Sequence, residues 1–182
     1  MLELSMNILD IVENSTRAGA RLVTVSITED REEDTLRIEI ADNGEGMEPD
    51  IIKKALDPFY TSKKARRVGL GLPMLSHAAK RAGGTFKIES KKGKGTRVTA
   101  DFKYSHIDRQ PLGDIPGTMA TMIAGNPNVD FVYTHMNVGK RYTLDTRVIK
   151  QELEDVSIYH PKVLRFIQEN IRDGLKEIGA GN

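Results

Sequence analysis

Two stretches of this chain carry residue types suited to holding a phosphorylated ligand. Asp10, Asn14 and Arg17 recur at helical spacing (i, i+4 and i+7), so a helix would place them on one face. An amide between an acid and a base can hold a metal ion and a phosphate, although such a stripe is more often a solvated surface. Residues 69–73 (Gly-Leu-Gly-Leu-Pro) open a second predicted helix, whose bare backbone amides and dipole favour phosphate. The alternative for this loop is a flexible glycine hinge.

A third candidate is the turn at residues 41–47, with the sequence Ala-Asp-Asn-Gly-Glu-Gly-Met. Alone, it predicts a tight turn, because Asn and Gly both tolerate positive φ. It gains weight from its place between the polar-faced helix and the glycine-rich loop, with a Gly-Lys-Gly-Thr turn at 93–96 further on. That last turn is not a P-loop, because the required earlier glycine is missing and a strand follows it.

The composition excludes several kinds of chemistry. The chain has no cysteine, which removes disulfides, thiolate metal sites and cysteine catalysis. Its net charge of +1 favours neither nucleic acid nor an anionic membrane as a partner. No apolar run approaches the roughly 20 residues that span a bilayer, and the N-terminus lacks a signal-peptide pattern. We therefore expect a soluble cytoplasmic protein.

The hydrophobic pattern predicts the elements that must position these residues. Leu4 to Ala18 predicts an amphipathic helix, ended by Gly19. Residues 22–28 and 36–40 alternate and predict an antiparallel pair with one buried face. Further along, we expect helices over 49–56 and from the 69–73 run to 83, and strands over 85–90 and 96–104.

Residues 105–182 carry no motif and predict a small α+β extension. We expect a short helix over 115–124, a hairpin over 129–147 and an amphipathic helix over 161–178. The apolar stripe of the last helix favours packing on the chain's own core. The alternative for that stripe is a homodimer or partner surface.

The four motifs, in this order over residues 4–104, resemble those of the GHKL ATPase superfamily, which includes gyrase, heat-shock chaperones, histidine kinases and mismatch-repair ATPases. The resemblance implies a Bergerat ATP-binding fold, an α+β two-layer α/β sandwich with a mixed, mostly antiparallel sheet and helices on one face. It divides the chain into an ATPase domain, residues 1–104, and the C-terminal extension, residues 105–182. Residues 57–63 look most like a histidine-kinase catalytic domain, whereas residues 13–20 look more like the mismatch-repair branch.

The resemblance also implies ATP and Mg²⁺ as cofactors and a role for each motif residue. Asp42 would accept a hydrogen bond from the adenine amine, with Thr96 and a water completing base recognition. Asn14 would bind Mg²⁺, and Arg17 stands where histidine kinases often carry a phosphate-contacting lysine. Other motif residues would bring the backbone close to the base or contact the phosphates, namely Gly44, Gly46, Lys63, Gly69, Leu70, Gly71 and Leu72.

The chain departs from the family pattern in two places. The hydrolysing branches carry a Glu one turn before the Asn, where it orients the attacking water; here that position is Asp10, one methylene shorter. A displacement of about 1 Å can cost about 100-fold in rate, so Asp10 is a candidate general base for slow hydrolysis. Because the sequence begins inside the first motif helix, we also expect neither the N-terminal strand nor the phosphoacceptor hairpin of histidine kinases. We expect the 129–147 hairpin to cover the sheet edge left open.

The predicted function is binding of Mg·ATP by a kinase-like ATPase domain in signal transduction. The γ-phosphate would pass to an unidentified protein partner, as in histidine kinases and anti-sigma serine kinases, or slowly to water. Residues 105–112 are predicted to be a linker that leaves the ATPase sheet. A phosphoacceptor around His106 is the weaker interpretation of this segment. The alternative function is an ATP-gated regulatory binding module with little turnover, so enzymatic activity stays open at this stage.

Overall fold

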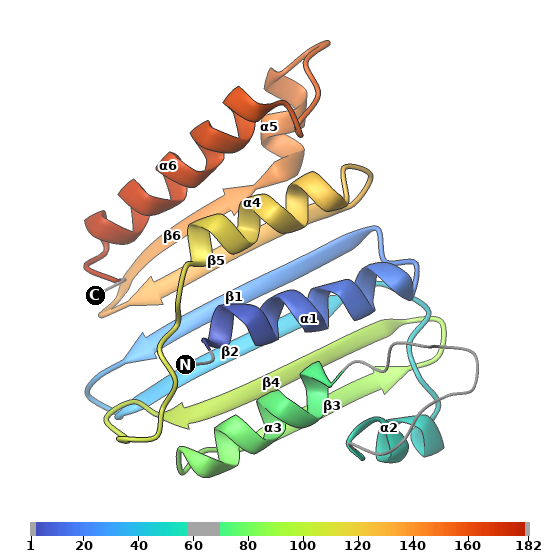
Figure 1. The fold of residues 1–182 in the computed structure, drawn as a ribbon, viewed down its shortest axis with the longest axis vertical. Helices are drawn as coiled ribbons and strands as arrows, with labels where there is room; N and C mark the ends of the chain where they lie inside the picture. The colour runs from blue at the N-terminus through green and yellow to red at the C-terminus, as the bar shows by residue number, and fades with distance from the viewer. Residues whose placement is uncertain (1–2, 58–69, 181–182) are drawn as a thin grey trace.

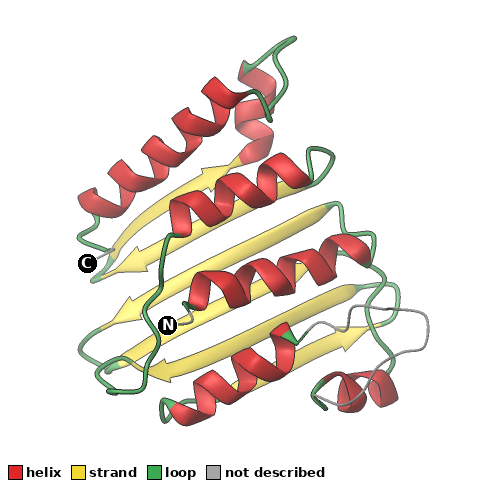
Figure 2. Cartoon of the chain, in the orientation of Figure 1, coloured by secondary structure: helices red, strands yellow, loops and turns green. Residues whose placement is uncertain are grey.

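The chain folds into a mixed six-stranded sheet with helices on one face (Figure 1, Figure 2). The computed structural model describes residues 3–57 and 70–180. Its helices are α1 (Leu4–Arg17), α2 (Pro49–Ala55), α3 (Gly71–Arg81), α4 (Ile115–Gly125), α5 (Thr146–Glu152) and α6 (Pro161–Glu177). Its strands are β1 (Leu22–Asp30), β2 (Thr35–Asp42), β3 (Phe86–Lys91), β4 (Gly95–Lys103), β5 (Asp130–Asn137) and β6 (Lys140–Asp145).

The strand order is β3-β4-β2-β1-β5-β6, and every neighbouring pair is antiparallel except β1 and β5. The alternation in β1 buries Val23, Val25 and Ile27 on the helix side, as the sequence predicts. The opposite face carries polar side chains, such as Arg37, which forms an ion pair with Asp101 at 2.6 Å. The α+β, two-layer fold expected from the sequence is confirmed.

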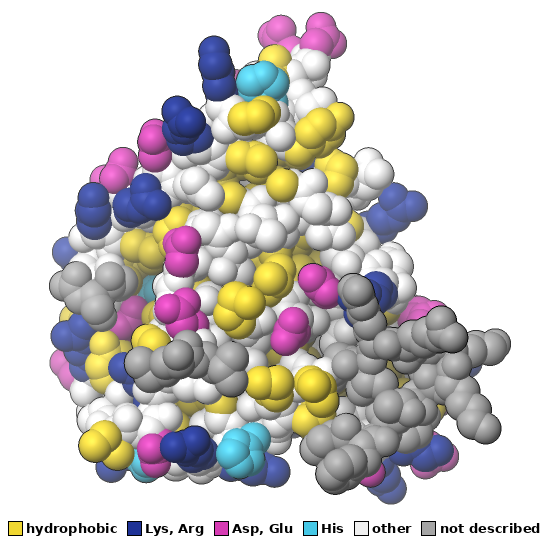
Figure 3. Space-filling view, in the orientation of Figure 1, with side chains coloured by type: hydrophobic (Ala, Val, Ile, Leu, Met, Phe, Trp, Pro, Cys, Tyr) yellow, Lys and Arg dark blue, Asp and Glu magenta, His cyan; other side chains and the backbone are white. Residues whose placement is uncertain are grey.

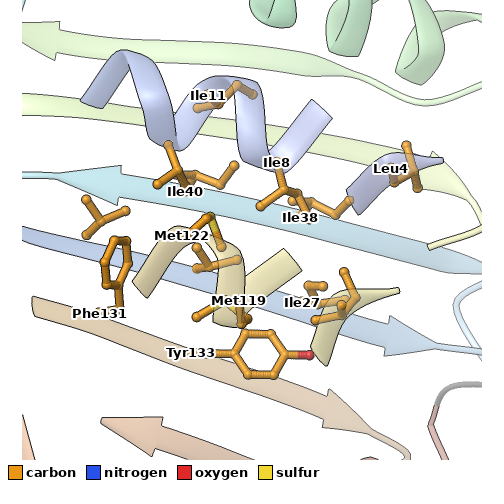
Figure 4. Packing of buried hydrophobic residues seen from close by; sticks show 14 of the residues in the cluster. Leu4, Ile8, Ile11, Ile27, Ile38, Ile40, Met119, Met122, Phe131 and Tyr133 are labelled. Carbon is orange, nitrogen blue, oxygen red and sulfur yellow. The ribbon is translucent and has the colours of Figure 1, made fainter. Parts of the chain in front are cut away.

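The core lies between the sheet and the helices that cover it. Helix α1 turns its apolar stripe towards β2, and α4 packs over β5 (Figure 4). Each fully buried Leu, Ile, Phe or Met side chain contributes about 1.5–3 kcal/mol. The residues labelled in this layer are Leu4, Ile8, Ile11, Ile27, Ile38, Ile40, Met119, Met122, Phe131 and Tyr133.

The C-terminal part of the chain continues the same sheet. Strand β5 pairs in parallel with β1, from Leu22 opposite Asp130 to Glu29 opposite Asn137. The hairpin therefore lies at the edge of β1, where we expected it. Val138 and Gly139 both have positive φ in the turn between β5 and β6, the backbone that a two-residue hairpin turn requires.

The hairpin ends earlier than the sequence indicated. The prediction extended its second strand to residue 147, but β6 ends at Asp145 and α5, which we did not predict, follows at once. Asp145 caps α5 by accepting a hydrogen bond from the Arg147 amide at 2.9 Å. Thr146 is buried, and its hydroxyl accepts a hydrogen bond from the Phe131 amide at 2.8 Å. These polar contacts stabilise the start of a helix at residues 146–147, where the sequence pattern predicted a strand.

Helix α6 uses its apolar stripe inside the chain. Val163, Ile167, Ile171 and Leu175 are buried, and they belong to the same hydrophobic cluster as the rest of the core. A homodimer through α6 stays a prediction. Such a dimer would use the outer face of the helix, where Phe166 is exposed. Figure 3 shows positive and negative side chains interspersed along α6. Among the described residues, no helix has the length and apolar character that crossing a bilayer requires.

Candidate functional site

Asp42 ends β2, on the side of the sheet that the helices cover. Its Oδ2 accepts a hydrogen bond from the Ser15 hydroxyl of α1 at 2.6 Å, and its Oδ1 accepts one from the Gly44 amide at 2.9 Å. The carboxylate is therefore held from both sides, by a helix and by the turn that follows its own strand. Each oxygen keeps a further lone pair for a ligand.

Thr96 lies directly opposite Asp42, in the antiparallel pair of β2 and β4. Its hydroxyl oxygen is 2.8 Å from the Ser90 hydroxyl oxygen of β3. Ser90 also accepts a hydrogen bond from the Met47 amide at 2.8 Å and donates one to the Gly95 carbonyl at 3.0 Å. The structure thus brings together Asp42 and Thr96, the two residues expected to recognise the base.

The glycines after Asp42 let the turn pass close to its neighbours. A Cβ on Gly44 would lie 2.8 Å from the Ala18 carbonyl oxygen. Gly46 has a φ of +67°, and a Cβ there would lie 2.1 Å from the Lys91 carbonyl oxygen. Both positions therefore have a packing requirement for glycine, and access of a ligand to the backbone, the role expected from the sequence, stays a prediction.

The polar face of α1 carries Asp10, Asn14 and Arg17, as the helical spacing predicts. Arg17 forms an ion pair with Glu13 at 2.8 Å, with both side chains about half exposed (50% and 49%). An exposed pair of this kind is worth less than about 1 kcal/mol, so the guanidinium can exchange Glu13 for a phosphate.

The surroundings of Asp10 shift the pKa of its carboxyl. Burial and the charge of Glu13 raise the pKa of its carboxyl, against the opposing charge of Arg17. The start of α3 packs against this residue, since a Cβ on Gly71 would lie 2.7 Å from the Asp10 Cβ. The glycine thus lets the N-terminus of α3 approach the polar face of α1.

The N-terminus of α3 can bind an anion through its first backbone amides. Leu70, its N-cap residue, is half exposed and has no polar side chain to cap them. Leu72 is buried and contributes to the core. Lys63 and Gly69, the other residues expected here, lie outside the described residues.

The donor set fits magnesium bound together with phosphates. Within residues 3–57 and 70–180, no group of three or more His, Asp or Glu side chains could hold a metal ion alone. Mg²⁺ commonly takes one or two protein oxygens together with phosphate oxygens and waters. Asn14 has a side-chain oxygen of this kind, on the helix that also contacts Asp42 through Ser15, and its role as a magnesium ligand stays a prediction.

Residues 2–106 match the sequence model of the histidine kinase-, DNA gyrase B- and HSP90-like ATPase family. The chain belongs to this family. The GHKL resemblance is therefore confirmed, and the chain carries an ATPase domain of the type found in histidine kinases and anti-sigma factors.

Several curated proteins are similar to this domain. Sensor histidine kinase ZraS of Escherichia coli O157:H7 is 27% identical over 110 residues, which are 60% of this chain and 24% of the kinase. Anti-sigma F factor of Clostridium acetobutylicum is 33% identical over 99 residues, 54% of this chain and 63% of that protein. Sporulation kinase C of Bacillus subtilis is 32% identical over 94 residues, 52% of this chain and 22% of the kinase. The match thus spans about a quarter of each kinase.

A solved structure shares the fold over more of the chain. The N-terminal domain of a DNA repair protein aligns with a TM-score of 0.50 and 16% identity, covering 80% of this chain and 53% of that one. At this identity the likeness concerns the fold alone.

Ser15 and Ser90 were not among the site residues predicted from the sequence. Both contact the residues expected to recognise the base, Asp42 and Thr96. A signal for Ser15 was present, because it is a hydroxyl residue on the apolar face of the first helix. Ser90 gave no such signal, since a serine at a strand end is common.

Proposed function

We propose that this protein binds Mg·ATP and transfers the γ-phosphate to a protein partner, with slow hydrolysis as a side reaction. The observation that carries the proposal is the Asp42 carboxylate, held by Ser15 and Gly44 opposite Thr96 at one end of the sheet. The family membership and the similarity to sensor kinases and an anti-sigma factor support it.

Each part of the site has a distinct task in this proposal. Asp42 accepts a hydrogen bond from the 6-amino group of adenine, and Thr96 contacts the ring through a water. Asn14 would hold the Mg²⁺ ion, which would neutralise phosphate charge when it is bound. The amides at the start of α3, including that of Gly71, receive the phosphates at the positive end of the helix dipole.

The fate of the phosphate depends on what approaches its outer end. Asp10 lies one helical turn before Asn14 and is one methylene shorter than a glutamate, which disfavours activation of water. A nucleophile on a partner protein needs no such base in the same position, because positioning and charge stabilisation supply most of the catalysis in phosphoryl transfer. We therefore propose that transfer to a protein is favoured over hydrolysis. We propose a cytoplasmic location, because the site requires ATP.

The test follows the γ-phosphate. The purified chain is incubated with γ-labelled ATP, Mg²⁺ and a protein extract from its source organism, and the label is measured on protein and as free phosphate. We expect label on a protein, reduced strongly by Asn14→Ala. Thr16→Ala is the matched control, because the Thr16 hydroxyl donates a hydrogen bond to the helix backbone, at the Glu13 carbonyl oxygen. Label released only as free phosphate would contradict the kinase proposal.

A second candidate function is an ATP-gated binding module. The short Asp10 side chain favours it, because nucleotide would then be held with little turnover. This candidate predicts tight ATP binding, no label on protein and negligible phosphate release. Hydrogen exchange with and without ATP would then show protection that persists for as long as ATP is present.

A further inference from the structure

We infer that Ser15 is a positioning residue for adenine recognition, acting through Asp42. The inference rests on the proposed function, since it concerns how the same site selects its base. Ser15 would not touch the nucleotide. Its hydroxyl would hold the Asp42 carboxylate in the orientation that accepts the 6-amino group.

The surroundings of Ser15 explain where its proton goes. Ser15 lies on the buried face of α1, and 5% of its surface is exposed to solvent. A hydroxyl buried among apolar side chains is costly unless it forms a hydrogen bond. Two acceptors are near it: Asp42 Oδ2 at 2.6 Å and the Ile11 carbonyl, one turn earlier in the helix, at 3.3 Å. The single proton goes to Asp42, because that contact is shorter and its acceptor is charged.

This hydrogen bond fixes the rotation of the carboxylate. With only the Gly44 amide on Oδ1, the group could turn about its Cβ–Cγ bond, a torsion with broad energy wells. A second donor on Oδ2 defines the plane of the carboxylate. The ligand then meets an acceptor that is already oriented, which removes an ordering cost from binding.

The hydrogen bond between Ser15 and Asp42 would also couple base recognition to metal binding. Ser15 directly follows Asn14, so consecutive residues of α1 would act on the base, through Asp42, and on the metal ion. A tilt of α1 would move both together. A purely structural role, in which Ser15 only joins α1 to β2, is the competing explanation. The experiment separates the two through the chemistry of the base.

The test measures the affinity of Ser15→Ala for two nucleotides by calorimetry. The first is ATP, and the second is purine riboside triphosphate, which lacks the 6-amino group. We expect ATP affinity to fall about tenfold, the effect of one hydrogen bond to a charged group. The affinity for purine riboside triphosphate should stay unchanged, because it offers Asp42 no donor. Thr16→Ala, which removes the neighbouring hydroxyl, is the matched control and should change neither affinity.

A double-mutant cycle adds a second readout. In an Asp42→Asn background, Ser15→Ala should cause no further loss of ATP affinity, because the two residues act as one unit. Ser15→Cys keeps the buried volume with a weaker donor and replaces Ser15→Ala in every comparison if the alanine variant does not fold. An equal loss for both nucleotides, or no loss for ATP, would overturn the inference while leaving the proposed function standing. Failure of the wild-type chain to bind ATP at all would overturn both.

Discussion

Asp10 is the candidate general base for the slow hydrolysis of ATP. A general base must be ionised to accept a proton, and burial and the charge of Glu13 raise the pKa of this carboxyl. Phosphate release should therefore fall as the pH is lowered through that raised pKa. Asp10→Asn should lower the rate and remove this pH dependence, whereas Asp10→Glu should raise the rate, by up to about 100-fold.

The measurement is phosphate release from ATP as the pH is lowered from neutral towards 3.8, the ordinary pKa of an aspartate. ATP affinity serves as the control, because it should hardly change in either variant. An Asp10→Asn chain with unaltered turnover and an unaltered pH profile would exclude Asp10 as the base.

Glu29 is a buried carboxylate that joins the ATPase part to the C-terminal extension. Its Oε1 lies 2.7 Å from His135 Nε2, and Tyr104 donates a hydrogen bond to Oε2 at 3.1 Å. Burial opposes ionisation of Glu29, but the hydrogen bond and charge of His135, together with Tyr104, outweigh it and hold the pKa below its ordinary value of 4.5. The ionised form is therefore the one that the folded state stabilises.

Glu29→Gln should lower the free energy of unfolding by about 3 kcal/mol at neutral pH, as removal of one partner of a buried pair does. Because the folded pKa is depressed, the stabilisation is complete above the ordinary value of 4.5 and is lost as the pH falls through the folded pKa. Urea unfolding should thus show wild type and variant converging in acid. Glu39→Gln, which removes an exposed pair with Arg97, is the control and should cost less than about 1 kcal/mol. A difference that persists unchanged in acid would contradict this explanation.

At the scale of elements, the turns at 43–47 and 91–95 depend on each other. The Gly93 amide donates to the Glu45 carbonyl at 2.6 Å, and Gly46 approaches the Lys91 carbonyl oxygen. Gly46→Ala should therefore destabilise the protein by about 2 kcal/mol or more, because the added Cβ meets backbone and the residue has a positive φ.

Gly93→Ala provides the matched comparison for that turn. It also has a positive φ, of +77°, but no atom of the described residues lies within 4 Å of the added Cβ. Its cost should be about 1 kcal/mol, from the backbone conformation alone. Urea unfolding of both variants measures the difference, and equal costs would argue against the close approach at Gly46.

The elements near the motifs could be predicted from the sequence because their signals are local. Alternation places Val23, Val25 and Ile27 inward in β1, and helical spacing gathers Asp10, Asn14 and Arg17 on one face. The contact between Ser15 and Asp42 joins residues 27 positions apart, and no local pattern encodes which side chain meets which. Helix α5 was missed for a related reason: its start depends on the buried contact of Thr146 with the Phe131 amide.

At the scale of the whole molecule, the two parts of the chain share one sheet and one core. The pairing of β5 with β1 and the contact of Glu29 with His135 both cross the boundary near residue 104. Unfolding should therefore be a single cooperative transition, followed equally by probes placed in each part. The fragment 1–104 should be less stable and prone to associate, because the edge of β1 would be open. Two separate transitions in the intact chain would instead indicate independently folding domains.

The central claim is that Asp42 anchors the adenine of a magnesium-bound ATP. Calorimetric titration with ATP, with and without Mg²⁺, tests it on wild type, Asp42→Asn and Asp30→Asn. Asp30 is the control, because it ends β1 at the other end of the β1–β2 pair, where it accepts hydrogen bonds from the amides of Glu32 and Glu33. We predict that Mg²⁺ strengthens binding, that Asp42→Asn weakens it by about 10- to 100-fold and that Asp30→Asn leaves it unchanged. Undiminished ATP affinity in Asp42→Asn would contradict the account.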